Sequence, residues 1–235
     1  MRRVLAFALG VTVLSHCAPV NYAALPEGEF SGSLFVMWVG EGDARGDGKF
    51  VFVPNPDAPL LFRRGGSPGV AEIRPGLMYT DGGSIPKAAQ LFKGFSPWGY
   101  APAYMVHDWL FVARHCLRDG KATEAQKDLA AVDFPTSAAI LGEAIRTLVA
   151  ERRVGPNDLA GAVISGTVNS PISRAIWDRD GQCEARAVSD AHRAEVERAF
   201  PGRSKAGLRR ALDAPDGFTA AARGPRARII AEISF

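Results

Sequence analysis

The sequence predicts an α+β fold, in which a small, mostly antiparallel sheet from the N-terminal third packs against a helical C-terminal part. Short β-branched and aromatic runs fill the first third and are separated by turns rich in Gly and Pro. From about residue 101 onward, apolar residues recur at helical spacing instead. Strands that come first and helices that come later are typical of α+β domains.

Four short strands are expected in the first third. They are 34–39, 50–53, 60–62 and 70–73. Each run ends at a polar or Pro-containing turn, such as 40–48, which fits short antiparallel connections.

Helices are expected in the remainder of the chain. The first follows Pro102, where Ala101, Met105, Val112 and Cys116 share one stripe. A second begins near Thr123, where Thr-x-x-Gln resembles a capping box, and should stop or kink at Pro135. The later helices and the closing strand are expected at 137–152, after the cap 157–158, at 189–200, at 204–212 and at 227–235.

Composition sets limits on the class of protein. The 235 residues suit one domain of ordinary size, and 47% hydrophobic with 23% charged residues excludes a wholly disordered chain or a multi-span membrane protein. Lys and Arg number 28 against 25 Asp and Glu, and no basic run exceeds two residues. No nucleic-acid partner is therefore predicted.

Residues 1–16 have the features of a signal peptide. Arg2 and Arg3 precede an apolar run, 4–14, that is too short to span a bilayer as a helix. Leu14-Ser15-His16-Cys17 resembles a bacterial lipobox, although His16 departs from the usual small residue. Cys17 is thus a candidate lipidation site, and the alternative is cleavage near Ala23 or Ala24. The protein is expected to be exported, as a periplasmic protein or as a lipoprotein anchored to the membrane.

Residues 17–30 are expected to form a tether, and 31–235 a single domain with a C-terminal helical extension. Once Cys17 is lipidated or removed, Cys116 and Cys183 remain. In an oxidising compartment these two could form a disulfide, and the alternative is two buried thiols.

Two segments carry the most distinctive residues. One is 73–86, which contains Thr80-Asp81-Gly82-Gly83-Ser84-Ile85-Pro86, and the other is 103–111, which contains His107-Asp108-Trp109-Leu110-Phe111. In order and spacing they resemble the DUF1353 family, an uncharacterised group of bacterial and phage proteins. The resemblance covers about residues 31–150, and Phe111 stands where the family usually has Tyr. It implies a fold, and an envelope or phage-particle component as partner, but no reaction.

The turn at 80–84 and the pair at 107–108 can also be interpreted chemically. The turn's glycines allow backbone N–H groups to converge on an oxygen. Asp81 can bind a metal, orient a histidine, or bond the amides of its own turn. Asp108 is expected on the buried stripe of its helix, so it needs a partner: His115, a backbone amide near Asp81, or a metal.

The function is expected to be one of two kinds. The first is a structural or binding domain of the cell envelope, in which Asp81 and Asp108 clasp turn and helix together. The second is a hydrolase with His107 as general base, Asp81, Asp108 and Ser84 as further candidate catalytic residues, and Asp81 with Asp108 as ligands of a divalent cation.

The second kind resembles phospholipase A2 in outline, since that family places an adjacent His and Asp on a helix after a Gly-rich calcium loop. The resemblance implies His107 as base, Asp108 as a Ca²⁺ ligand, and Asp128 or Asp133 as the residue that orients the histidine. The dense cysteine framework of that family is absent here.

Overall fold

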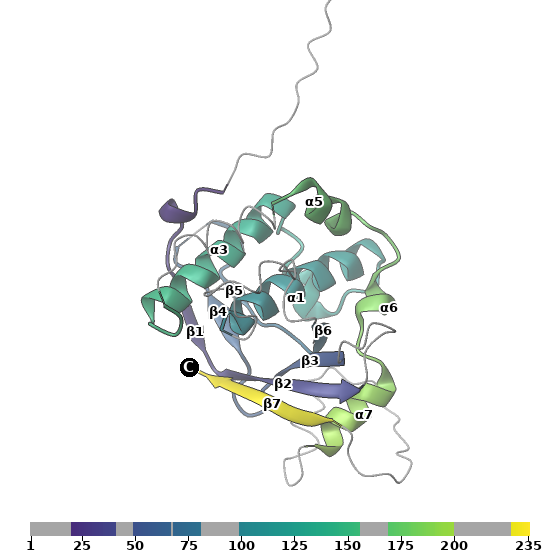
Figure 1. Ribbon diagram of the computed structural model, residues 1–235. Helices are drawn as coiled ribbons and strands as arrows, with labels where there is room; N and C mark the ends of the chain where they lie inside the picture. The colour runs from purple at the N-terminus through teal and green to yellow at the C-terminus, as the bar shows by residue number, and fades with distance from the viewer. Residues whose placement is uncertain (1–19, 41–48, 67, 81–98, 156–168, 200–226) are drawn as a thin grey trace, which may run out of the picture.

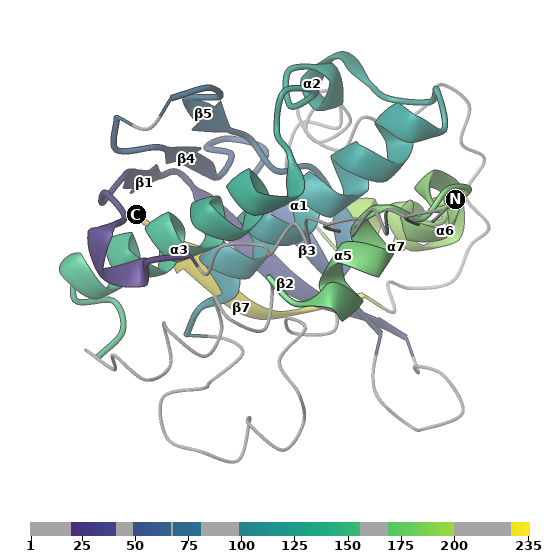
Figure 2. The ribbon, with the colours of Figure 1, turned by 90° about the horizontal axis from the view of Figure 1, so that it is seen from above.

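The computed structural model describes residues 20–40, 49–66, 68–80, 99–155, 169–199 and 227–235. It contains two antiparallel sheets and a set of helices, which confirms the α+β class. In Figure 1 the larger sheet lies below helix α1, and helix α3 lies beyond α1. The same order of layers is seen from above in Figure 2.

The larger sheet has the strand order β6-β3-β2-β7, and every neighbouring pair is antiparallel. Its strands are β2 (Ser33–Gly40), β3 (Lys49–Pro54), β6 (Met78–Thr80) and β7 (Arg228–Ser234). The pairing of β7 with β2 confirms the closing strand expected at 227–235 and joins the chain's last described segment to its first strands.

This sheet is covered on both faces. Leu34, Val36 and Phe52 belong to one apolar cluster with the residues of α1, whereas Phe35 and Val51 belong to a second cluster on the opposite face. A strand buried on both faces has no polar side to show, which explains why 34–39 is a continuous apolar run rather than an alternating one.

A second, smaller sheet has the order β1-β4-β5. Its strands are β1 (Glu29–Ser31), β4 (Leu61–Arg63) and β5 (Glu72–Ile73). The chain passes from β1 to β2 at Gly32, whose φ of +79° and whose contact with the Pro59 carbonyl leave no room for a side chain. The sequence predicted one sheet, but the strands form two, and the tight connection at Gly32 separates β1 of one sheet from β2 of the other.

Helix α1 (Ala101–Arg118) forms the centre of the domain. Pro102 lies in its first turn, where a missing N–H costs no helical hydrogen bond. Met105, Trp109 and Val112 are buried in the cluster shared with the larger sheet. The helix expected from the periodicity is therefore present.

The two following helices confirm one expected boundary and correct another. Thr123 caps α2 (Glu124–Lys127) with the expected capping box, in which the Gln126 side chain accepts from the Thr123 N–H at 2.9 Å. Pro135 does not stop this helix, which ends earlier. It lies instead in the first turn of α3 (Phe134–Ala150), which Asp133 caps by accepting from the Thr136 N–H at 2.8 Å.

The later helices are short. They are α5 (Pro171–Trp177), α6 (Cys183–Arg186) and α7 (Asp190–Arg198). The helix expected at 189–200 corresponds to α7, which packs with Val196 against the second face of the larger sheet. The expected helices after 157–158 and at 204–212 lie outside the described residues.

The N-terminal segment differs from the expected tether. Residues 22–24 form a short 3₁₀ helix, η1 (Tyr22–Ala24), and β1 follows within a few residues. Val20 and Tyr22 pack against the main apolar cluster. The described part of 17–30 is thus a component of the fold.

Candidate functional site

Three polar residues share one face of α1. Tyr104 precedes His107 by three residues and Asp108 by four, which places it between these two on the surface of the helix. We call this set the α1 polar face. Met78 of β6 belongs to the same apolar cluster as α1, so the strand that leads to Asp81 packs beside this helix.

His107 is buried, with 7% of its side chain exposed. Its Nδ1 lies 3.9 Å from Oδ1 of Asp108, which is longer than a hydrogen bond, and its ring lies 5.0 Å from that of Phe111. The other ring nitrogen, Nε2, is buried and has no hydrogen-bond partner among the residues that the structure describes. One nitrogen thus faces a carboxylate and the other is unused.

Of the three partners that the sequence suggested for Asp108, the structure excludes one, His115. His115 is completely buried, and its Nε2 donates to the Ile176 carbonyl at 2.8 Å rather than to Asp108. Asp108 itself keeps 19% of its side chain exposed. Partial access to water explains how this carboxylate is tolerated on a helix that is otherwise almost entirely buried.

Tyr104 completes the α1 polar face. Its hydroxyl is buried and bonds to none of the described residues. Burial raises the pKa of Tyr104, and the nearby Tyr100 and Asp108 raise it further. Sequence reasoning assigned no role to Tyr104, although its spacing of three and four residues from His107 and Asp108 was a signal that could have found it.

The two acids proposed to orient His107 occupy other positions. Asp133 caps α3, and the hydrogen bond from Thr136 lowers its pKa. Asp128 is exposed at the end of α2. The carboxylate nearest to His107 among those described is that of its neighbour Asp108.

Three predicted site residues lie outside the described residues: Asp81, Ser84 and Cys17. Thr80, which precedes Asp81, is buried at the end of β6. The two distinctive segments do meet elsewhere, because a Cβ on Gly76 would lie 2.7 Å from the Trp109 ring. Close packing of a glycine on an indole ring connects the turn before β6 to α1.

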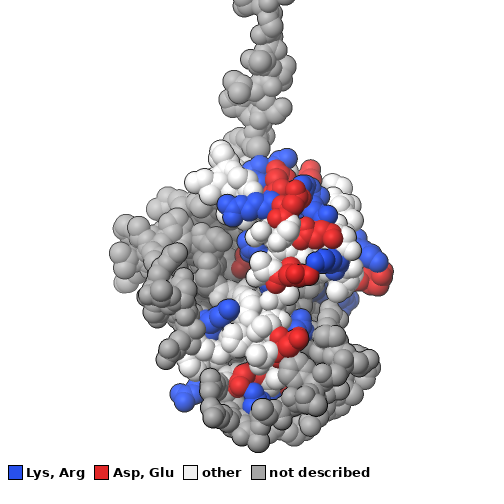
Figure 3. Space-filling view, turned by 90° about the vertical axis from the view of Figure 1, so that its right-hand side faces the viewer, with Lys and Arg blue, Asp and Glu red and all other residues white. Residues whose placement is uncertain are grey.

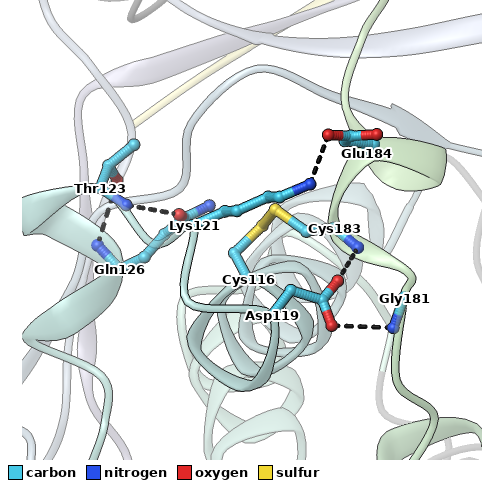
Figure 4. Close-up of a disulfide and its surroundings, with 8 residues drawn as sticks. All are labelled: Cys116, Asp119, Lys121, Thr123, Gln126, Gly181, Cys183 and Glu184. Carbon is cyan, nitrogen blue, oxygen red and sulfur yellow. Dashed lines mark hydrogen bonds and ion pairs between the residues drawn. A yellow bond between two sulfur atoms is a disulfide. The ribbon is translucent and has the colours of Figure 1, made fainter.

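Cys116 of α1 and Cys183 of α6 form a disulfide. Figure 4 shows Asp119 beside it, accepting from the Cys183 N–H at 2.9 Å and the Gly181 N–H at 2.8 Å. These two backbone N–H groups lower the pKa of Asp119. Trp177 packs on Phe111 at 5.0 Å, so the segment fixed by the disulfide also covers part of α1.

Among the residues that the structure describes, no group of three or more His, Cys, Asp or Glu could hold a metal ion. The proposed pair of Asp81 and Asp108 includes a residue outside that set. Asp108 could supply one carboxylate oxygen to a divalent cation.

Comparison with protein-family models, with curated proteins and with solved structures finds no match for this chain. The DUF1353 resemblance therefore stays a prediction from the residues. No helix in the described ranges has the length and hydropathy needed to cross a membrane.

Proposed function

We propose that this protein is an exported component of the cell envelope whose domain binds a small polar ligand at the α1 polar face. The observation that carries the proposal lies on this face: Oη of Tyr104 and Nε2 of His107 are buried and have no hydrogen-bond partner among the described residues. A buried polar atom without a partner lowers the stability of the folded state. A ligand that supplies the missing hydrogen bonds is one reason for a protein to retain such atoms.

The α1 polar face favours a neutral or cationic ligand. The Tyr104 hydroxyl can donate and accept, the His107 ring can do either, and the Asp108 carboxylate only accepts. A carboxylate at this position would repel an anion. A molecule with hydroxyl or amide groups complements these three side chains, and a divalent cation complements Asp108 alone.

One feature supports export, and a second favours processing at Cys17 over cleavage at Ala23 or Ala24. A disulfide between Cys116 and Cys183 fits an oxidising compartment outside the cytosol. In addition, Val20 and Tyr22 pack on the domain, so cleavage at Ala23 or Ala24 would remove residues that belong to the fold. Processing at Cys17 would leave them in place.

The free energy of unfolding of two variants tests the proposal without a known ligand. Tyr104→Phe removes a hydroxyl that bonds no described residue, so we expect the free energy of unfolding to rise by about 1 kcal/mol. The matched control is Thr147→Val. Thr147 is buried and its hydroxyl is fully used, donating to the Glu143 carbonyl and accepting from the Gly28 N–H, each at 2.8 Å. The control should lose about 1–3 kcal/mol.

Urea unfolding of both variants gives the comparison. If Tyr104→Phe is destabilised as much as Thr147→Val, the hydroxyl has a structural partner and the proposal is wrong. NMR of the histidine rings then reports binding directly. Added Ca²⁺ or Zn²⁺ should shift His107 and leave His115 unchanged if a cation is the ligand.

A second candidate function is a hydrolase with His107 as general base. Its specific support is the His107 ring itself, in which a carboxylate lies 3.9 Å from Nδ1 while Nε2 is left for a proton. Distances of this kind often shorten when substrate binds. Asp108 would then stabilise the protonated ring.

His107→Gln tests this candidate with p-nitrophenyl acetate, p-nitrophenyl phosphate and bis(p-nitrophenyl) phosphate as substrates. We expect the variant to lose at least 100-fold in rate, the scale of general-base catalysis, with an unchanged melting temperature. Wild-type protein that is inactive on all three, or a variant that loses activity and stability together, would count against catalysis by His107.

A further inference from the structure

The folded domain begins very close to Cys17. Val20 packs against the main apolar cluster, and η1 follows with Tyr22. Arg146 of α3 donates to the Tyr22 carbonyl at 3.5 Å and to the Ala23 carbonyl, and forms an ion pair with Glu27 at 3.0 Å. The segment is thus attached to α3 through the guanidinium of Arg146, which contacts three of its residues.

Glu27 and Gly28, which follow η1, also contact the rest of the domain. The Gly28 N–H donates to the Thr147 hydroxyl at 2.8 Å. A Cβ on Gly65 would lie 1.7 Å from the Glu27 carbonyl oxygen, so this backbone is pressed against the connection between β4 and β5. No flexible tether separates η1 from β1.

Only three peptide units join Cys17 to Val20, and they span at most about 11 Å. We infer that, when Cys17 is acylated, the domain lies directly on the lipid surface with η1 and α5 facing it. The inference rests on the proposed envelope location, because it takes Cys17 as the anchor. A linker of this length cannot let the domain turn freely.

The arrangement of the helices identifies the contacting face. In Figure 1, η1 and α5 lie on the same side of the domain, and Figure 2 looks onto that side. Helix α5 carries the most exposed large apolar side chain described, Ile172, which is 75% exposed. Pro171 and Ala175 on the same helix are exposed as well.

Charge has little part in this contact. The arginines near the face have acidic neighbours: Arg146 pairs with Glu27, and Arg174 with Asp178. Figure 3 shows Lys and Arg side by side with Asp and Glu on an adjoining face. An apolar side chain such as Ile172 can enter the headgroup region, but it cannot hold a protein on a membrane without a covalent anchor.

The experiment uses a chain that begins at Cys17 and keeps every described residue. Since Cys116 and Cys183 are joined, Cys17 is its one free thiol. This thiol is coupled to phosphatidylcholine vesicles that carry maleimide headgroups. Hydrogen exchange should slow at least threefold at 21–25 and 171–177 and stay unchanged at 183–198, relative to uncoupled protein with vesicles.

The matched control inserts ten Gly and Ser residues between Pro19 and Val20. This longer linker should abolish the protection, and Ile172→Ser on the short linker should reduce it at 171–177. Equal exchange on short and long linkers, or protection spread evenly over the chain, would overturn the inference. Chemical coupling makes this result independent of acylation in the cell, which mass spectrometry of Cys17 tests separately.

Discussion

At the scale of single residues, two neighbouring arginines show how burial changes the contribution of an ion pair to stability. Arg64 is 4% exposed and forms a two-pronged pair with Glu143 of α3, at 2.7 and 2.8 Å. Arg63 is 49% exposed and pairs with Glu29 and Glu72 on the surface of the small sheet. The first pair connects the small sheet to α3, whereas the second is open to water.

We predict that Glu143→Gln destabilises the protein by about 3–5 kcal/mol, because a buried guanidinium would lose its counter-ion. Arg63→Ala, one position away from Arg64, should change the urea midpoint little, since water screens its ion pairs. A double variant, Arg64→Met with Glu143→Leu, should recover most of the loss because neither charge remains buried. Equal losses in Glu143→Gln and Arg63→Ala would contradict this view of the buried pair.

At the scale of the elements, the disulfide attaches α6 to the end of α1. The N-cap residue of α6, Gln182, makes no capping side-chain bond. Asp119, at the end of α1, supplies the cap instead by accepting from Cys183 N–H. Lys121 and Glu184 add an ion pair at 2.5 Å between the same two regions.

We predict that reduction of this disulfide lowers the free energy of unfolding by about 4 kcal/mol in the chain-entropy model, given a separation of 67 residues. The measurement is urea unfolding with and without dithiothreitol. A Cys116→Ala, Cys183→Ala variant should match the reduced wild type and ignore dithiothreitol. Wild-type stability that does not respond to dithiothreitol would show that the cross-link adds nothing to the fold.

The helices and strands also show which parts of the fold the sequence alone could predict. Apolar runs and helical spacing predicted β2, β3, α1 and β7, because these signals are local and repeated. Strand β1 was missed, since Glu29–Ser31 is three residues long with one apolar side chain. Pro135 was misassigned because a proline suits a first helical turn as well as it breaks a helix.

The candidate site was predictable in part for the same reason. His107 and Asp108 were distinguished by their unusual place on an apolar helix. The pair of Arg64 and Glu143 could not be predicted, since its members are 79 residues apart and no local pattern relates them. Long-range contacts of this kind depend on how the whole chain packs.

At the scale of the whole molecule, two histidines that pack between elements make the stability of the fold depend on pH. Burial lowers the pKa of His115, whose Nε2 donates to the Ile176 carbonyl of α5 and whose buried Nδ1 has no partner within the described ranges. Burial, together with Lys49, lowers the pKa of His192, whose Nδ1 lies 2.8 Å from the Tyr79 hydroxyl. One histidine secures α5 to α1, and the other secures α7 to the larger sheet.

We predict that the protein loses stability as the pH falls below about 6.5, the ordinary pKa of histidine. The unfolded chain binds these protons more readily than the folded one, so the stability is complete above that pH and declines toward the lower folded pKa values. Asp119 and Asp133 have lowered pKa values too, but their contribution is lost only below about pH 4. A window from pH 7.5 to 5.5 therefore isolates the histidines.

Urea unfolding at pH 7.5, 6.5 and 5.5 measures this effect. His192→Gln should flatten the dependence in part and leave the contribution of His115. The same variant should keep the fold, because a glutamine amide can replace the ring as a partner of the Tyr79 hydroxyl. Stability that is constant or rises between pH 7.5 and 5.5 would mean that the fold keeps neither ring neutral.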